Sequence, residues 1–220
     1  MPRLSNPFIL LWSHRDLVVQ FTVRELHLRH RGSQLGHFWA LLSPVTMLAL
    51  YLFVFGMIMG GKFGVIKNET TFDFALAMFL GLSLFHIIAE TVAASPLLIV
   101  NQPNFVKKVV FPLEIIPISH VFASVYHAML SIGILVLAAV LGAPFGHAGI
   151  SWVGLLVLPF LILPLALTAL GLSWGLAALG VFVRDISQLA PFLSTAILFA
   201  SAVVYAPAKI PPGIWAILRF

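Results

Sequence analysis

The sequence RELHLRHRGSQLGHFW, residues 24–39, joins a charged segment to a long apolar run that reaches about residue 59. Five of the chain's twelve Lys and Arg residues lie at or before Arg31, although only 9% of the chain is charged. A basic segment followed at once by an apolar run long enough to cross a bilayer is typical of a protein that lies along a membrane surface and then enters the membrane. This stretch predicts an integral membrane protein.

The composition of the whole chain indicates the same class of protein. Of its 220 residues, 61% are hydrophobic, and the mean hydropathy is +1.09, whereas soluble domains are about a quarter charged. The net charge of +5 is explained by basic residues that collect on the cytoplasmic side of a membrane. We therefore expect no nucleic-acid partner, since the chain lacks a soluble basic face. The absence of cysteine excludes disulfides and thiolate sites.

We predict two parts, a cytoplasmic and interfacial amphipathic segment over residues 1–37 and a transmembrane domain over residues 38–220. In the first part, apolar residues recur at roughly helical spacing from Leu17 to Leu28, with charged residues between them. This pattern predicts a helix that lies in the headgroup plane, with its polar side turned to water or to a partner.

Apolar runs in the second part predict five membrane-spanning helices. They cover residues 38–59, 74–94, 115–141, 152–183 and 189–205. Pro159 and Pro164 predict a kink, a tilt or a partly re-entrant path in the fourth span. Eight Lys and Arg residues fall on the side of the N-terminus and four on the other side, so the N-terminus is predicted to be cytoplasmic.

Two glycine patterns are weak signals. Residues 56–62, GMIMGGK, match the first seven positions of a nucleotide-binding P-loop, but Phe63 stands where a Ser or Thr hydroxyl would bind magnesium. We therefore expect no nucleotide site in this chain. Gly171 and Gly175 have the spacing that lets two membrane helices approach closely.

Four ionisable side chains fall inside predicted spans, namely His86, Glu90, His120 and His127. Such residues can build a proton path or a metal site. The alternative, which we favour, is that Glu90 reaches interfacial water or a basic partner near the cytoplasmic end of its span, while each neutral histidine bonds a backbone carbonyl. We expect no catalytic constellation and no metal site.

Three segments resemble, in order and spacing, the motifs of one known family. They are residues 24–39 with Pro44 (RELxLRxRGSxLGxxW), residues 104–117 (NFVKKVVFPxExxP) and residues 183–188 (VRDIxQ). The chain is similar in these segments to the permease subunits of type-2 ABC exporters for polysaccharides, which include O-antigen, capsule and teichoic acid exporters. It departs from the family at His30, where Tyr is usual, and in residues 201–205, which lack an expected proline.

The resemblance implies a six-span permease in the inner membrane of a bacterium, with both termini cytoplasmic, so we expect a sixth span to be missing here. It also implies a homodimer that works with two copies of a separate ATPase, which would hold the ATP and magnesium. The N-terminal helix and the 95–112 segment would contact that ATPase. A tunnel lined by aromatic side chains would pass a glycan linked to a lipid diphosphate.

The resemblance assigns candidate residues to both sites. Those for ATPase contact and coupling are Arg24, Glu25, Arg29, Arg31, Asn104, Phe105, Lys107, Lys108, Arg184 and Asp185. Those for the tunnel are Phe53, Phe55, Phe79, Phe85, Trp174, Phe182, Phe192 and Phe199, although many of these would also suit a lipid-facing surface.

From the sequence we therefore expect the transmembrane subunit of an ATP-driven polysaccharide exporter, with no enzymatic activity of its own. Three alternatives stay open. A type-2 ABC exporter of a drug or small lipid would share the same motifs. A membrane-embedded enzyme would use the four intramembrane His and Glu residues. A non-functional fragment is the third.

Overall fold

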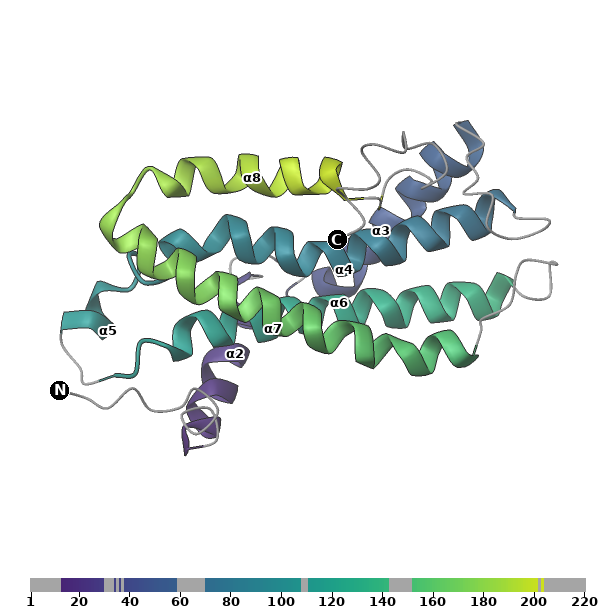
Figure 1. Cartoon of the computed structure of the whole chain (residues 1–220). Coiled ribbons are helices and arrows are strands. Elements are labelled where there is room, and N and C mark those ends of the chain that lie inside the picture. Colours follow the sequence, from purple (N-terminus) through teal and green to yellow (C-terminus); the bar gives the residue numbers. More distant parts are fainter. Residues whose placement is uncertain are drawn as a thin grey trace.

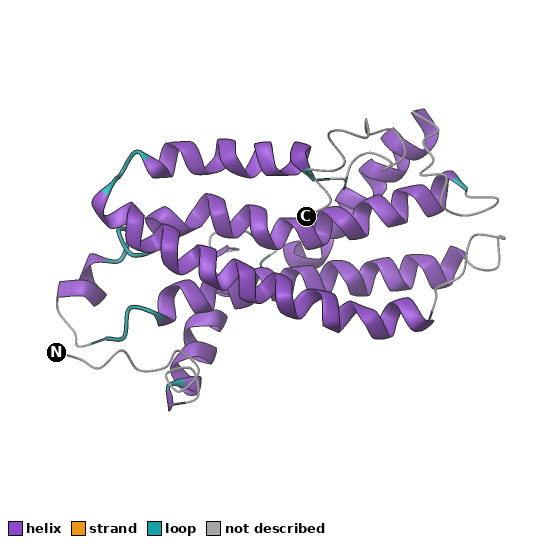
Figure 2. Ribbon diagram, in the orientation of Figure 1, coloured by secondary structure: helices purple, strands orange, loops and turns teal. Residues whose placement is uncertain are grey.

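The computed structural model describes residues 13–29, 34, 36, 38–58, 70–107, 111–142, 152–201 and 203. Within this part of the chain the regular structure is helical and no residue lies in a strand (Figure 2), as the sequence predicts. The elements are α2 (Arg15–Arg29), α3 (Phe38–Tyr51), the π-helical segment η1 (Leu52–Ile58), α4 (Thr71–Leu98), α5 (Pro103–Lys107), α6 (Ile115–Gly142), α7 (Trp152–Phe182) and α8 (Ile186–Ala200).

Among the described residues, three helices are long and apolar enough to cross a membrane, and two apolar helices are shorter. The long ones are α4, α6 and Val153–Phe182 of α7, and the shorter apolar ones are Phe38–Val54 and α8. A helix satisfies its own backbone hydrogen bonds, which a bilayer cannot do, so long apolar runs fold this way. Each predicted span coincides with one of these five helices. The second span extends beyond residues 74–94 at both ends, while α8 ends before residue 205.

Local sequence sets where α4 begins and how α7 runs. Thr70 and Asp73 form a reciprocal capping box, in which each side chain accepts a hydrogen bond from the backbone N–H of the other residue.

In α7 the helix continues through Pro159 and Pro164 without a break. The residues of the predicted fourth span therefore form one continuous helix.

Helix α4 lies in the middle of the bundle, where it contacts α3, η1, α6, α7 and α8 (Figure 1). It approaches α7 closely at Gly180, where an added Cβ would lie 2.0 Å from the carbonyl oxygen of Pro96. A hydrogen bond of 2.8 Å joins the buried hydroxyls of Ser95 and Ser173 between the same two helices. The close approach thus depends on Gly180 and on small polar side chains.

The predicted glycine pair of α7 has no such role within this chain. An added Cβ at Gly171 or Gly175 would meet no atom within 4 Å. The predicted spacing therefore does not produce the helix contact here, and a third glycine of the same helix does.

The elements that connect the helices on the predicted cytoplasmic side lie at one end of the bundle. Figure 1 shows α5 and the turn between α7 and α8 at this end, with α2 beside the start of α6. Helices η1 and α6 end at the opposite end of the bundle. Each of the three segments that resemble the family motifs therefore has residues near this end of the bundle with α5, among those that the structure describes.

Candidate functional site

The polar side of α2 is turned toward the bundle at two positions one helical turn apart. Glu25 Oε1 lies 3.2 Å from His120 Nδ1 on α6. One turn later, the Arg29 guanidinium forms an ion pair with Glu90 on α4 and donates a hydrogen bond of 3.4 Å to the hydroxyl of Ser124 on α6. His120 and Ser124 are also four residues apart, so the two helices present matching faces. We call the pairs Glu25–His120 and Arg29–Glu90 the charged ladder.

The charged ladder is largely withdrawn from solvent. The side chains of Glu25, Arg29 and Glu90 are 25%, 19% and 20% exposed, and that of His120 is 6% exposed. A carboxylate only accepts hydrogen bonds, so His120 Nδ1 carries the proton in this contact. The hydrogen bond with His120 lowers the pKa of Glu25 below its ordinary value of 4.5, while burial opposes this and the charges of His120, Arg29 and Arg24 reinforce it. Glu25 is therefore a carboxylate at neutral pH.

An aromatic cluster lies one turn before the ladder and joins α2 to α5. The ring of Phe21 has its centroid 5.3 Å from that of Phe105 and 4.8 Å from that of Phe111, and the latter two are 5.1 Å apart. The Arg24 guanidinium lies 5.4 Å from the Phe21 ring centroid and 5.3 Å from that of Phe105, within the range of a cation–π contact. We call Phe21, Arg24, Phe105 and Phe111 the aromatic cluster.

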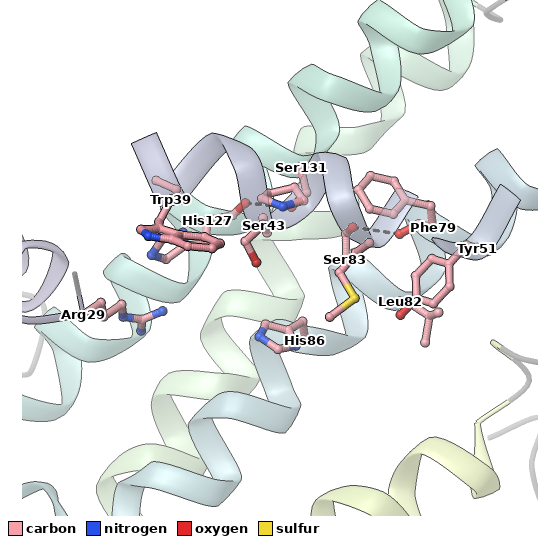
Figure 3. Close-up of a pocket in the computed structure, with 14 residues that line it drawn as sticks. Arg29, Trp39, Ser43, Tyr51, Phe79, Leu82, Ser83, His86, His127 and Ser131 are labelled. Carbon is pink, nitrogen blue, oxygen red and sulfur yellow. Dashed lines mark hydrogen bonds between the residues drawn. The ribbon is translucent and has the colours of Figure 1, made fainter. Parts of the chain in front are cut away.

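A pocket of about 300 Å³ lies between α3, α4 and α6, next to the end of α2. Figure 3 shows Arg29, Trp39 and His127 toward one end of it and Tyr51 and Phe79 toward the other. The remaining described lining residues are Ala40, Ser43, Pro44, Met47, Leu82, Ser83, His86, Ala128 and Ser131.

The chemistry of this pocket is mixed. Among the described residues that line it, Arg29 is the one with a permanent charge, and hydroxyls, imidazoles and aromatic faces supply the rest. Such a lining can stack on an apolar ring face and bond to hydroxyl groups, as small-ligand pockets do. Arg29 belongs both to the pocket and to the charged ladder, so the position of α2 affects one end of the pocket.

The structure divides the predicted ATPase-contact residues into two groups. Arg24, Asn104, Arg184 and Asp185 are exposed, and Phe105 is partly buried in the aromatic cluster. In the second group, Glu25 and Arg29 turn inward to α6 and α4, whereas the sequence predicts that the polar side of this helix faces water or a partner. Arg31 and Lys108 lie outside the described residues, as does the side chain of Lys107.

The predicted tunnel residues do not share one surface. Phe79 is buried in the core and lines the pocket, and the partly buried Trp174 donates a hydrogen bond of 3.2 Å to the carbonyl of Glu114. Phe85 is partly buried in α4. Four side chains are exposed on the outside of the chain, and the side chain of Phe55 lies outside the described residues. The exposed ones are Phe53, Phe182, Phe192 and Phe199.

The four intramembrane ionisable residues separate into two settings. Glu90 and His120 have partners on α2, so the favoured interpretation holds for Glu90, which has a basic partner, whereas His120 bonds a carboxylate and not a backbone carbonyl. His86 and His127 line the pocket. In the part of the chain that the structure describes, no three His, Asp or Glu side chains come together in a way that could hold a metal ion.

Sequence reasoning missed the contact between α2 and α6. The spacing of Glu25 and Arg29, and that of His120 and Ser124, places each pair on one helix face, which is a signal present in the sequence. Nothing in the sequence says that these two faces meet across 95 residues of chain. The pocket was missed for the same reason, because its walls come from four helices.

Comparison with known proteins places these observations in a family. Residues 16–219 match the model of the ABC-2 type transporter family. The O-antigen export system permease protein RfbA of Myxococcus xanthus is 28% identical over 195 residues, which are 89% of this chain and 70% of that protein. A protein of the same name from Klebsiella pneumoniae is 25% identical over 197 residues, which are 89% of this chain and 71% of that protein. With a match over nearly its whole length, the chain is a transporter membrane protein that belongs to the ABC-2 family.

Proposed function

We propose that this chain is the transmembrane subunit of an ABC exporter that moves a lipid-linked polysaccharide across the inner membrane of a bacterium. The observation that carries the proposal is the match of residues 16–219 to the ABC-2 family together with relatives that are named O-antigen export permeases. The substrate would be of the O-antigen, capsule or teichoic acid type. Two copies of the chain would work with two copies of a separate ATPase, which holds ATP and magnesium.

The arrangement at one end of the bundle supports an ATPase docking surface there. The aromatic cluster ties α2 to α5, so the N-terminal helix and the short helix between two spans form one unit. Arg24 and Asn104 are exposed on this unit, and Arg184 and Asp185 are exposed at the α7–α8 turn. These residues are available to a partner, and the excess of Lys and Arg on this side supports a cytoplasmic orientation.

The exposed aromatics support a role between two copies of the chain. Phe182 ends α7, and Phe192 and Phe199 lie two turns apart on α8, each with most of its surface exposed. In this proposal they line a path for the glycan, since an aromatic face stacks on the apolar C–H face of a sugar ring without selecting one hydroxyl pattern. The pocket next to Arg29 is lined by residues of one chain and does not include Phe182, Phe192 or Phe199.

Deletion of the gene in its own host tests the proposal. We expect surface polysaccharide to disappear and the lipid-linked polymer to accumulate inside the cell, and a plasmid-borne copy to restore export. Normal surface polysaccharide combined with a new sensitivity to drugs would overturn the proposed substrate and favour the drug exporter. Normal surface polysaccharide and unchanged drug tolerance would contradict both exporters.

A further inference from the structure

Helix α2 connects α5 to the core helices α4 and α6 through side chains. Phe21, Glu25 and Arg29 follow one another at intervals of four residues and so share one face of α2. The first contacts α5 through Phe105, and the other two contact α6 and α4. This face of α2 therefore offers a route by which a displacement of α5 can reach α4 and α6.

The charges in this contact are poorly suited to a purely stabilising role. A buried ion pair adds little net stability, because desolvation of both charges offsets their attraction, but removal of one partner leaves a buried charge and is costly. Here Oε2 of Glu90 and Nε2 of His120 are buried and have no hydrogen-bond partner among the described residues. The ladder therefore adds charge matching, which fixes the register of α2, to an apolar contact in which Val18 belongs to one buried cluster with Ile118 and Val121 of α6.

The same contact reaches the pocket. Arg29 pairs with Glu90, bonds Ser124 and forms part of the pocket wall with Trp39 and His127. If α2 shifts along α6, the Arg29 side chain shifts with it, and that end of the pocket changes. A link thus runs from α5 through α2 to the space between α3, α4 and α6.

We propose that Glu25, Arg29, Glu90 and His120 are positioning residues, which keep α2 in register on α4 and α6 so that its displacement is passed to these helices. The proposal assigns no contact with the ATPase to Glu25 and Arg29. The role of these four residues in transport rests on the proposed function, whereas their role in holding α2 does not.

A cysteine reporter tests whether the ladder holds α2. The chain has no cysteine, and Val18 lies on α2 with only 5% of its surface exposed, so Val18→Cys introduces one protected thiol. In the purified full chain, we expect slow alkylation by a water-soluble maleimide. Adding Glu90→Gln leaves the Arg29 charge without its partner and should speed alkylation about tenfold by loosening α2. The double change Arg29→Gln with Glu90→Gln removes both charges and should restore most of the protection.

Asp16→Asn is the matched control, because Asp16 is also an α2 carboxylate but its side chain is 89% exposed. It should leave the alkylation rate unchanged. If Glu90→Gln accelerates alkylation no more than Asp16→Asn does, the ladder does not hold α2 and the proposal fails. If Glu90→Gln cannot be purified, Glu25→Gln replaces it, because Glu25 is the more exposed of the two carboxylates, and the same two outcomes apply.

The ratio of polysaccharide exported to ATP hydrolysed tests the role in transport. A positioning role predicts that Glu90→Gln lowers this ratio about tenfold while ATPase association persists, and that the double change recovers it. A role in folding alone would lower both activities together with the amount of protein and leave the ratio unchanged, which would overturn the positioning role. A wild-type chain that neither binds an ATPase nor exports would refute the proposed function, and the thiol reporter would still decide whether the ladder holds α2.

Discussion

The contact between α4 and α7 and the contact between α2 and α6 join helices in opposite ways. In the first, Gly180 lets α7 approach the backbone of Pro96, and two serine hydroxyls bond to each other. In the second, the pairs of the charged ladder bridge the helices through longer side chains. The first contact depends on a close approach at a glycine, whereas the second adds two charged pairs to the apolar packing around Val18. An added atom is not tolerated at the close approach, whereas the loss of one charge is tolerated if its partner charge is removed too.

The largest expected effect is at Gly180. Gly180→Ala places a methyl group 2.0 Å from the carbonyl oxygen of Pro96, which is backbone and cannot rotate away. We expect a loss of about 3 kcal/mol or failure to accumulate folded protein, since overpacking forces the helices apart. Thermal unfolding in detergent and yield after extraction measure this.

Gly171→Ala is the control for that change, because it makes the same substitution in the same helix where no atom lies within 4 Å. It should keep or slightly raise the unfolding temperature, since Ala favours a helix more than Gly does. Equal effects of the two substitutions would show that the α4–α7 contact does not depend on a close approach at Gly180.

A smaller effect is expected at the serine pair. Ser95→Ala leaves the buried Ser173 hydroxyl without its partner, which should cost about 1 kcal/mol. Changing both serines to Ala removes the unsatisfied hydroxyl, so the double variant should unfold nearer to the wild-type temperature than either single variant. Additive losses would mean that the two hydroxyls do not act as a pair.

The smallest effect is the acid sensitivity of the ladder. The folded state holds the pKa of Glu25 below its ordinary value of 4.5, mainly through the hydrogen bond with His120. Its contribution to stability is therefore present above about pH 4.5 and is lost as the pH falls through the lower folded-state value. Between pH 6 and pH 3 the unfolding temperature of the wild type should fall further than that of Glu25→Gln. Parallel curves would contradict this role of Glu25.

The sequence predicts the helices well because their signals are local. The apolar runs and the helical spacing of α2 follow from hydropathy and period alone, and both are recovered to within a few residues except near residue 205. Contacts between distant segments carry no such signal. The pairing of Glu25 and Arg29 with residues of α6 and α4 was therefore not predicted, and the weak glycine signal at Gly171 and Gly175 did not point to the close approach at Gly180.

The same distinction between local patterns and distant contacts applies to the candidate site. The motifs around Arg24, Phe105 and Arg184 could be recognised in the sequence, because a family keeps short local patterns. That Phe105 stacks on Phe21, or that Arg29 reaches Glu90, depends on how α2 docks against the bundle. Docking is a property of the whole fold, so these partners became visible only in three dimensions.

The most direct test of the account is whether an ATPase purifies with the tagged chain. Extraction from membranes of its own host should recover a P-loop ATPase of ABC size together with ATP hydrolysis in the eluate. Charge reversal at Lys107 and Lys108, Lys107→Glu with Lys108→Glu, should lower this recovery without unfolding the chain. Recovery of the folded wild-type chain with no ATPase would contradict the central claim that this protein is one subunit of an ATP-driven exporter.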